Sequence, residues 1–397
     1  MEPLFPVLTA HLSCSLTHIE PAIQQDGLSL IDSLVTATPS FIAANYSRIL
    51  PDCLAQISAR STDGKKKTGV STEVAENISA IQWRIDVLQR VDKILEALLA
   101  FAAKPMQGEY SRKVKNAVFA ENLHCEIYQT IPDQLNISDL TMRRNEDPFL
   151  NVIDQVLPLI IDSWVEATAA EGKKQRRSFV SNEMLALLES IAGILDKIIN
   201  YAQLVDGNLN LLQHFRDKYA ADLNFRLLGN LPYSSSAGRC NWANIKLCNV
   251  YLSLNPLLED QCSKVFSCLE DSPNTEPLER LKVLKNLLAE SSGLDEENRA
   301  AAVDQVLELY KTLPPGSKAR QHTIKLLAEL AEDEERLGEW VGSLPTHLAT
   351  ASKAGQGKGL VEETLLLETM LKFAQMKNPH LQTSFRLSTV GLEGKYR

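Results

Sequence analysis

The sequence is poor in the residues from which β-rich folds are built. Aromatic residues make up 6% of the 397 positions, and glycine occurs only 18 times, whereas leucine and alanine are abundant. Sandwiches and barrels need many aromatic and β-branched strand residues and glycine-containing turns. We therefore expect a helical fold. The chain also lacks any uncharged apolar run of the ~18 residues that a membrane helix requires, so we predict no membrane segment.

Other absences bear on compartment and partners. The seven cysteines are odd in number and scattered, which argues against a disulfide framework and favours a reducing compartment, the cytosol or the nucleus. The first residues, MEPLFPVLTAHLS, contain no basic segment and no long apolar segment, so we expect no signal peptide. The net charge of −9 gives no support to a dedicated nucleic-acid clamp.

Motifs for catalysis or for cofactor binding are missing as well. The nearest approach to a phosphate-binding loop, around residues 354–360, has Ser352 in place of the first glycine and Gly359 in place of the hydroxyl residue. No GxSxG or HExxH motif occurs, and His11 and His18 are two histidines without further ligands. Four cysteines in the second half have spacings that match no zinc site: Cys240, Cys248, Cys262 and Cys268. We predict no metal, no cofactor and no enzymatic activity.

Apolar residues at helical spacing run through almost the whole chain. In the clearest stripe they recur every three or four residues from Ile81 to Leu98, with Ser79 or Asn77 as alternative first residues of the helix. The segment from Phe149 to Val165 predicts a strongly apolar helix that Pro158 should kink. Further stripes predict helices over 209–219, 242–254, 257–269, 278–288, 303–313, 324–330, 340–348 and 361–376.

This pattern predicts an all-α protein. Helix pairs of roughly 40 residues suit an armadillo/HEAT-like α-α superhelix, a solenoid, although no sharp repeat signature is present; a globular helical bundle is the alternative. We expect four parts. Residues 1–103 are an N-terminal helical repeat domain, and residues 104–147 are an irregular connector that contains a short helix near 114–128. Residues 148–378 are further helical repeats, and residues 379–397 are a frayed tail.

Charged clusters provide the candidate interaction residues. Lys173, Lys174, Arg176 and Arg177 form a basic loop that suits RNA phosphates or a nuclear-import receptor, or is simply solvated. A second basic cluster, the lysine run at 65–67, lies in a polar segment that we expect to be an exposed loop. An acidic run can be an exposed turn or a docking patch for a basic partner. It comprises Glu329, Glu332, Asp333, Glu334 and Glu335. The four tryptophans, at 83, 164, 242 and 340, lie in helical stripes and are interpreted as packing residues and not as base-stacking platforms.

Several segments resemble the Ipi-one / testis-expressed protein 10 family. They are PLFPVLTAHLSCSLTHI at 3–19, IQQDGLSLIDSLVTATPSFI at 23–42, IQWRIDVLQRVDKILEAL at 81–98, VLPLIIDSWVEA at 156–167 and, more weakly, WVGSLPTHLA at 340–349. The order HLSxxxTHI, then the QDxLxxxD segment, then QWRxxVLxR is what makes the resemblance specific. The match is strongest over residues 3–100.

The resemblance implies an armadillo-like, non-catalytic scaffold of a Rix-type complex that acts in ribosome biogenesis. Implied partners are a leucine-rich Rix-type scaffold protein, a WD-repeat protein, the midasin-type AAA ATPase and the pre-large-subunit ribosome. Implied roles are rRNA processing, through removal of the second internal transcribed spacer, and recruitment of midasin. The implied location is the nucleus, in nucleolus and nucleoplasm, with a cytoplasmic pool left open. An alternative role is that of a transcription or chromatin adapter in a desumoylating-protease complex. Compared with the family, the chain is expected to be short at both ends.

Overall fold

The chain divides into two compact units, Met1–Asn255 and Pro256–Arg397, which are described separately. The computed structural model describes residues 5–58, 79–103, 148–170, 178–205, 210–235, 240–255, 259–270, 277–289, 294–332, 335–353 and 360–384.

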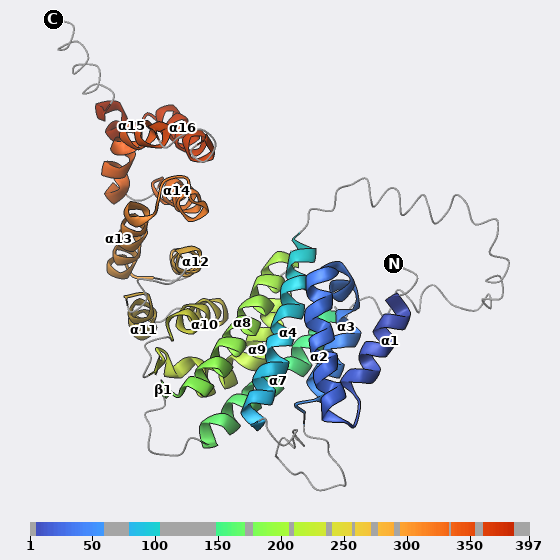
Figure 1. The fold of residues 1–397 in the computed structure, drawn as a ribbon. Helices are drawn as coiled ribbons and strands as arrows, with labels where there is room; N and C mark the ends of the chain where they lie inside the picture. Colours follow the sequence, from blue (N-terminus) through green and yellow to red (C-terminus); the bar gives the residue numbers. More distant parts are fainter. Residues whose placement is uncertain are drawn as a thin grey trace, which may run out of the picture. The chain divides into compact units, whose positions relative to one another are not determined.

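The helices of the first unit form two rows (Figure 1). One row consists of α1 (Phe5–Leu16), α3 (Pro39–Ala55), α7 (Pro148–Ala170) and α9 (Asn210–Arg226). The other consists of α2 (Pro21–Ala37), α4 (Ala80–Ala102), α8 (Asn182–Val205) and α10 (Asn241–Leu254). Each helix packs against the next one in its own row and against its partner in the other row. This arrangement, in which each helix pair contacts only its neighbours, is that of an armadillo/HEAT-like superhelix.

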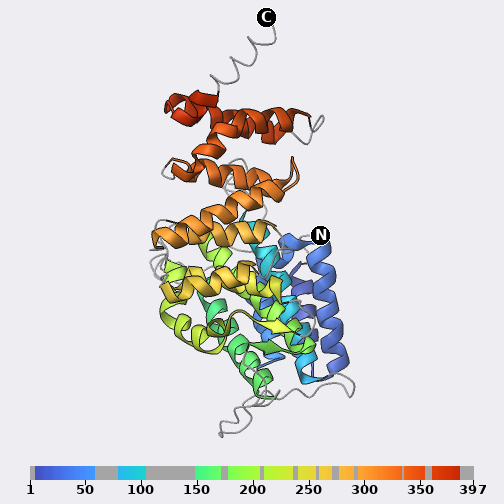
Figure 2. The same cartoon turned by 90° about the vertical axis from the view of Figure 1, so that its left-hand side faces the viewer.

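The second unit repeats the same alternation (Figure 2). Its helices are α11 (Glu259–Glu270), α12 (Pro277–Leu287), α13 (Glu296–Thr312), α14 (Lys318–Leu330), α15 (Gly338–Lys353) and α16 (Leu360–Gln375), with the short helix η6 (Glu335–Leu337) before α15. Helices α12, α14 and α16 pack in succession, and α13 and α15 pack against members of that row. Residues 379–384 are helical, and Leu381 is buried.

Helix α4 shows how the sequence produces these elements. Ser79 is its N-cap: the side-chain hydroxyl accepts a hydrogen bond from the backbone N–H of Gln82. This confirms Ser79, and not Asn77, as the start. Residues Ile85, Leu88 and Val91 are each no more than 1% exposed. The predicted apolar stripe is therefore the face that packs into the core.

The predicted all-α, armadillo/HEAT-like fold is confirmed. Among the described residues, the β-structure is limited to two-residue strands, β1 (Phe179–Val180) and β2 (Ser234–Ser235), which pair in parallel. The short helix η4 (Leu228–Asn230) precedes β2 in the chain. Helix α7 continues across Pro158, so the kink stays a prediction. The predicted short helix near 114–128 lies outside the described residues, and the boundaries at 103, 147 and 378 also stay predictions. No helix in the described ranges is long and apolar enough to cross a membrane.

Candidate interaction surface

The predicted basic patch is not among the residues whose structure is described. Lys173, Lys174, Arg176 and Arg177 all lie in the undescribed range 171–177, between the end of α7 and strand β1, and the lysine run at 65–67 is outside the described residues too. The interaction sites proposed from these clusters therefore stay predictions.

The structure instead brings together charged residues on the row α2–α4–α8–α10. We call this set the polar ladder; it comprises Asp32, Arg90, Asp92, Lys93, Asp196, Lys197, Lys246 and Asn249. Each contact joins one helix of the row to the next. Sequence reasoning missed it, although charged residues inside apolar stripes, such as Asp92 and Asp196, were a possible signal.

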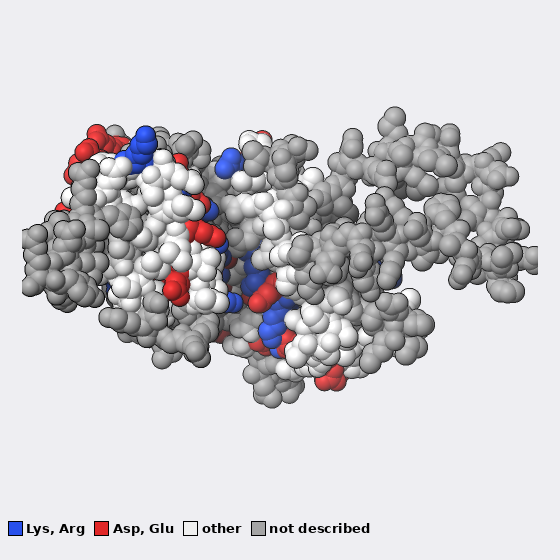
Figure 3. Space-filling view, turned by 90° about the horizontal axis from the view of Figure 1, so that it is seen from above, with Lys and Arg blue, Asp and Glu red and all other residues white. Residues whose placement is uncertain are grey.

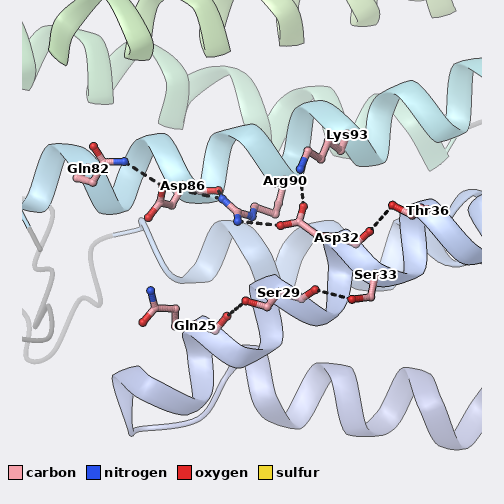
Figure 4. A network of polar contacts seen from close by, with 9 residues as sticks. All are labelled: Gln25, Ser29, Asp32, Ser33, Thr36, Gln82, Asp86, Arg90 and Lys93. Atoms are coloured by element: carbon pink, nitrogen blue, oxygen red, sulfur yellow. Dashed lines mark hydrogen bonds and ion pairs between the residues drawn. The ribbon is translucent and has the colours of Figure 1, made fainter. Parts of the chain in front are cut away.

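The first step of the polar ladder joins α2 to α4 (Figure 4). Both oxygens of the Asp32 carboxylate accept hydrogen bonds from α4: Arg90 Nη2 donates at 2.8 Å and Lys93 Nζ at 2.6 Å. Arg90 also donates to the backbone oxygen of Asp86 at 3.0 Å, which fixes the guanidinium along its own helix. The Asp32 side chain is 30% exposed and that of Lys93 is 46% exposed, so solvent screens this pair.

The next steps join α4 to α8 and α8 to α10, and the side chains involved become progressively less exposed to solvent. Lys197 Nζ donates to Asp92 at 2.7 Å. Burial raises the pKa of Asp92 above its ordinary value, and the opposing effect of Lys197 does not fully offset it. Asp196 is 2% exposed; it accepts hydrogen bonds from Lys246 Nζ at 3.0 Å and from Asn249 at 2.9 Å. These buried charges are fully paired within the protein.

A second polar cluster lies in the other row, between α7 and α9. The Asp154 carboxylate accepts hydrogen bonds from Lys218 at 2.7 Å, from Tyr219 at 2.8 Å and shares one with His214 at 2.9 Å. Partial burial alone would raise the pKa of Asp154, but these hydrogen bonds outweigh it and lower the pKa to about 2. The carboxylate therefore stays ionised and bonded, and a general base with so low a pKa is weak.

In the second unit a buried ion pair ties α16 to the first turn of α14. Glu362, 1% exposed, accepts hydrogen bonds from Arg320 Nε at 2.8 Å and from the backbone N–H of Gly316. Arg320 also donates to the backbone oxygens of Tyr310 and Leu313, at 3.1 and 2.8 Å. The guanidinium thereby closes the α13–α14 turn and holds the first turn of α16.

The described polar clusters are contacts between helices. In the described part of the chain no group of three or more His, Cys, Asp or Glu side chains could hold a metal ion. Cys53 is fully buried, and burial raises the pKa of its thiol, which makes it a poor nucleophile.

The structure also locates the four tryptophans and part of the acidic run. Trp83, Trp164 and Trp340 are buried, which confirms their interpretation as packing residues, and Trp242 is half-buried beneath Lys246. Of the acidic run, Glu329 and Glu335 are exposed and Glu332 pairs with Lys372, whereas 333–334 lie outside the described residues.

Comparison with known proteins supports the resemblance seen in the sequence. Residues 1–95 match the family model Ipi1_N, described as a Rix1 complex component involved in 60S ribosome maturation. Over an alignment 272 residues long, which covers 58% of this chain and 29% of the relative, the chain is 25% identical to the testis-expressed protein 10 homolog of Danio rerio. The predicted resemblance is confirmed.

The extent of these matches is uneven. The family model ends within α4, so it covers the first helix pairs of the first unit. The chain spans less than a third of the curated relative that it matches. Four members of the polar ladder lie within the matched segment: Asp32, Arg90, Asp92 and Lys93.

Proposed function

We propose that this chain is a non-catalytic helical-repeat scaffold subunit of a Rix1 complex in maturation of the large ribosomal subunit. The observation that carries the proposal is the match of residues 1–95 to a family described as a Rix1 complex component. Its paired helical rows supply what a scaffold needs, since extended repeat arrays bind partners along their exposed helix faces. The polar ladder fits this role because it fixes neighbouring helices in one register.

The proposed partners are a leucine-rich Rix-type scaffold protein, a WD-repeat protein and the midasin-type ATPase. Through them the chain would act on removal of the second internal transcribed spacer and on midasin recruitment, in nucleolus and nucleoplasm. With a net charge of −9, the chain is expected to reach the pre-ribosome mainly through proteins, with RNA contact limited to basic loops.

Depletion of the protein followed by blotting of pre-rRNA tests the ribosomal role. We expect precursors that retain the second internal transcribed spacer to accumulate, and re-expression of the chain to reverse this. Normal spacer processing after complete depletion would contradict the proposal and favour the transcription-adapter role.

Replacement of Lys173, Lys174, Arg176 and Arg177 by glutamate tests the proposed RNA contact. Loss of several phosphate contacts should weaken association with pre-ribosomal particles and flatten its dependence on salt. A matched variant with four exposed lysines changed to glutamate controls for the added negative charge; these are Lys285, Lys311, Lys318 and Lys325. If both variants associate like the wild type, the loop is a solvated connector.

A further inference from the structure

Helix α16 presents an apolar stripe to solvent. Leu360, Leu367 and Leu371 are 66%, 50% and 60% exposed. Together with exposed Thr364 and Ala374 they recur at intervals of four and three residues, which places them on one side of the helix over about 21 Å. The buried residues of α16 (Glu362, Leu366, Thr369 and Phe373) occupy the opposite side. The stripe therefore faces away from α14 and α15, the helices on which α16 packs.

The preceding helix of the same row provides a comparison. At the same spacing, the exposed side of α14 carries Lys318, His322, Lys325 and Glu329. Its solvent-facing stripe is polar, as expected for an exposed surface, whereas that of α16 is leucine-rich. Figure 3, seen from above, looks onto the end of the second unit where α15 and α16 lie: uncharged residues cover much of it, with acidic and basic side chains at its edge and isolated acidic ones within it. Exposed leucines that line up along one side of a helix are typical of a contact surface.

We propose that the apolar stripe of α16 binds the same stripe of a second copy of this chain, with the two helices antiparallel. Contact residues that alternate at steps of four and three are typical of two helices that pack as a left-handed coiled coil. A two-fold axis that places Leu367 against Leu371 of the other copy also places Thr364 against Ala374. The small side chains at these outer positions let the two backbones approach.

The charges of α16 favour the antiparallel direction. Acidic Glu363 and Glu368 lie in its first two-thirds and Lys377, which is exposed, follows its end. An antiparallel pair brings Glu363 of one copy near Lys377 of the other and opposes the two helix dipoles favourably. The two Glu368 side chains approach each other near the axis. One helix pair is a small interface, so a weak, concentration-dependent dimer is expected.

Sedimentation of the purified 397-residue chain over a range of concentrations tests the proposal. We expect a reversible monomer–dimer equilibrium. Leu367→Glu with Leu371→Glu should weaken it at least about tenfold, because two half-exposed leucines that the dimer buries become charged. Glu368→Gln should tighten it about twofold by removing a like-charge contact. The matched control is Phe225→Glu on α9, which also charges an exposed apolar residue, 76% exposed, and should leave the equilibrium unchanged.

Circular dichroism of each variant verifies that the helices persist, which is expected because all the substituted side chains are exposed. Cross-linking gives the direction: a mixture of Thr364→Cys and Ala374→Cys chains, treated with a short bismaleimide, should form more covalent dimer than either variant alone. A chain that stays monomeric at all concentrations, or a dimer that Leu367→Glu with Leu371→Glu does not weaken, would overturn the proposal. Efficient cross-linking of Thr364→Cys to itself would refute the antiparallel arrangement.

Discussion

The deepest contact of the polar ladder makes the sharpest stability prediction. Asp196 and Lys246 have side chains only 3% and 10% exposed, and their charged atoms lie 3.0 Å apart. Lys246→Met removes the cation and leaves the Asp196 carboxylate buried without its counter-charge. Breaking a buried ion pair in this way costs about 3–5 kcal/mol, because the remaining charge stays out of water. We expect the free energy of unfolding to fall by that amount.

The matched control is Lys93→Met in the same row of helices. Lys93 lies closer to Asp32, at 2.6 Å, than Lys246 does to Asp196, but its side chain is 46% exposed. Because solvent screens an exposed pair, its loss should cost less than about 1 kcal/mol. Asp32 also keeps Arg90 as a partner in this variant, so the comparison contrasts a buried carboxylate that loses its cation with a partly exposed one that retains a cation, and shows that the shorter distance does not decide the cost.

A rescue variant completes the test. In the double variant Asp196→Asn with Lys246→Met, no charge is left buried, and the new amide oxygen can still accept from Asn249. We expect it to recover at least about 1.5 kcal/mol relative to Lys246→Met. Urea unfolding, followed by far-UV circular dichroism and by tryptophan fluorescence, measures all three. Equal losses for Lys246→Met and Lys93→Met, or no recovery in the double variant, would refute the reasoning.

Two further predictions concern a cap and a pH dependence. Ser79→Ala removes the N-cap of α4 and should lower the free energy of unfolding by about 1 kcal/mol, whereas Ser79→Asn should retain most of it; equal losses in urea unfolding would contradict the capping role. The pKa of Asp154 is about 2, below its unfolded value, so its interactions with Lys218, His214 and Tyr219 stabilise the fold above about pH 4. That contribution should disappear as the pH falls from 4 to 2. The melting-temperature difference between wild type and Asp154→Asn should therefore shrink over this range, and a constant difference would exclude the proposed linkage.

Local patterns made the helices predictable. The stripe from Ile81 to Leu98 lies within α4, and that from Val361 to Met376 matches α16 to within one residue, because period and caps are written in neighbouring residues. Helix α13 begins at Glu296, seven residues before the predicted start at Val303. Its first turns, EENRAAA, form a helix through the high helix propensity of alanine and glutamate and not through an apolar stripe.

Contacts between distant segments were not predictable. Asp196 and Lys246 are 50 positions apart, and their contact depends on the register of α8 against α10. The parallel pair of β1 and β2 depends in the same way on tertiary placement, since two residues are too few to show alternation. The apolar stripe of α16 was visible in the sequence, but only the structure shows that part of it is exposed.

Affinity purification of the tagged 397-residue chain from its own cells tests the central claim most directly. Quantitative mass spectrometry should recover the Rix-type scaffold protein, the WD-repeat protein and pre-large-subunit particles, enriched over a tagged, unrelated helical-repeat protein expressed at the same level. Recovery of the chain without these partners and particles, at low salt and from intact nuclei, would contradict the account.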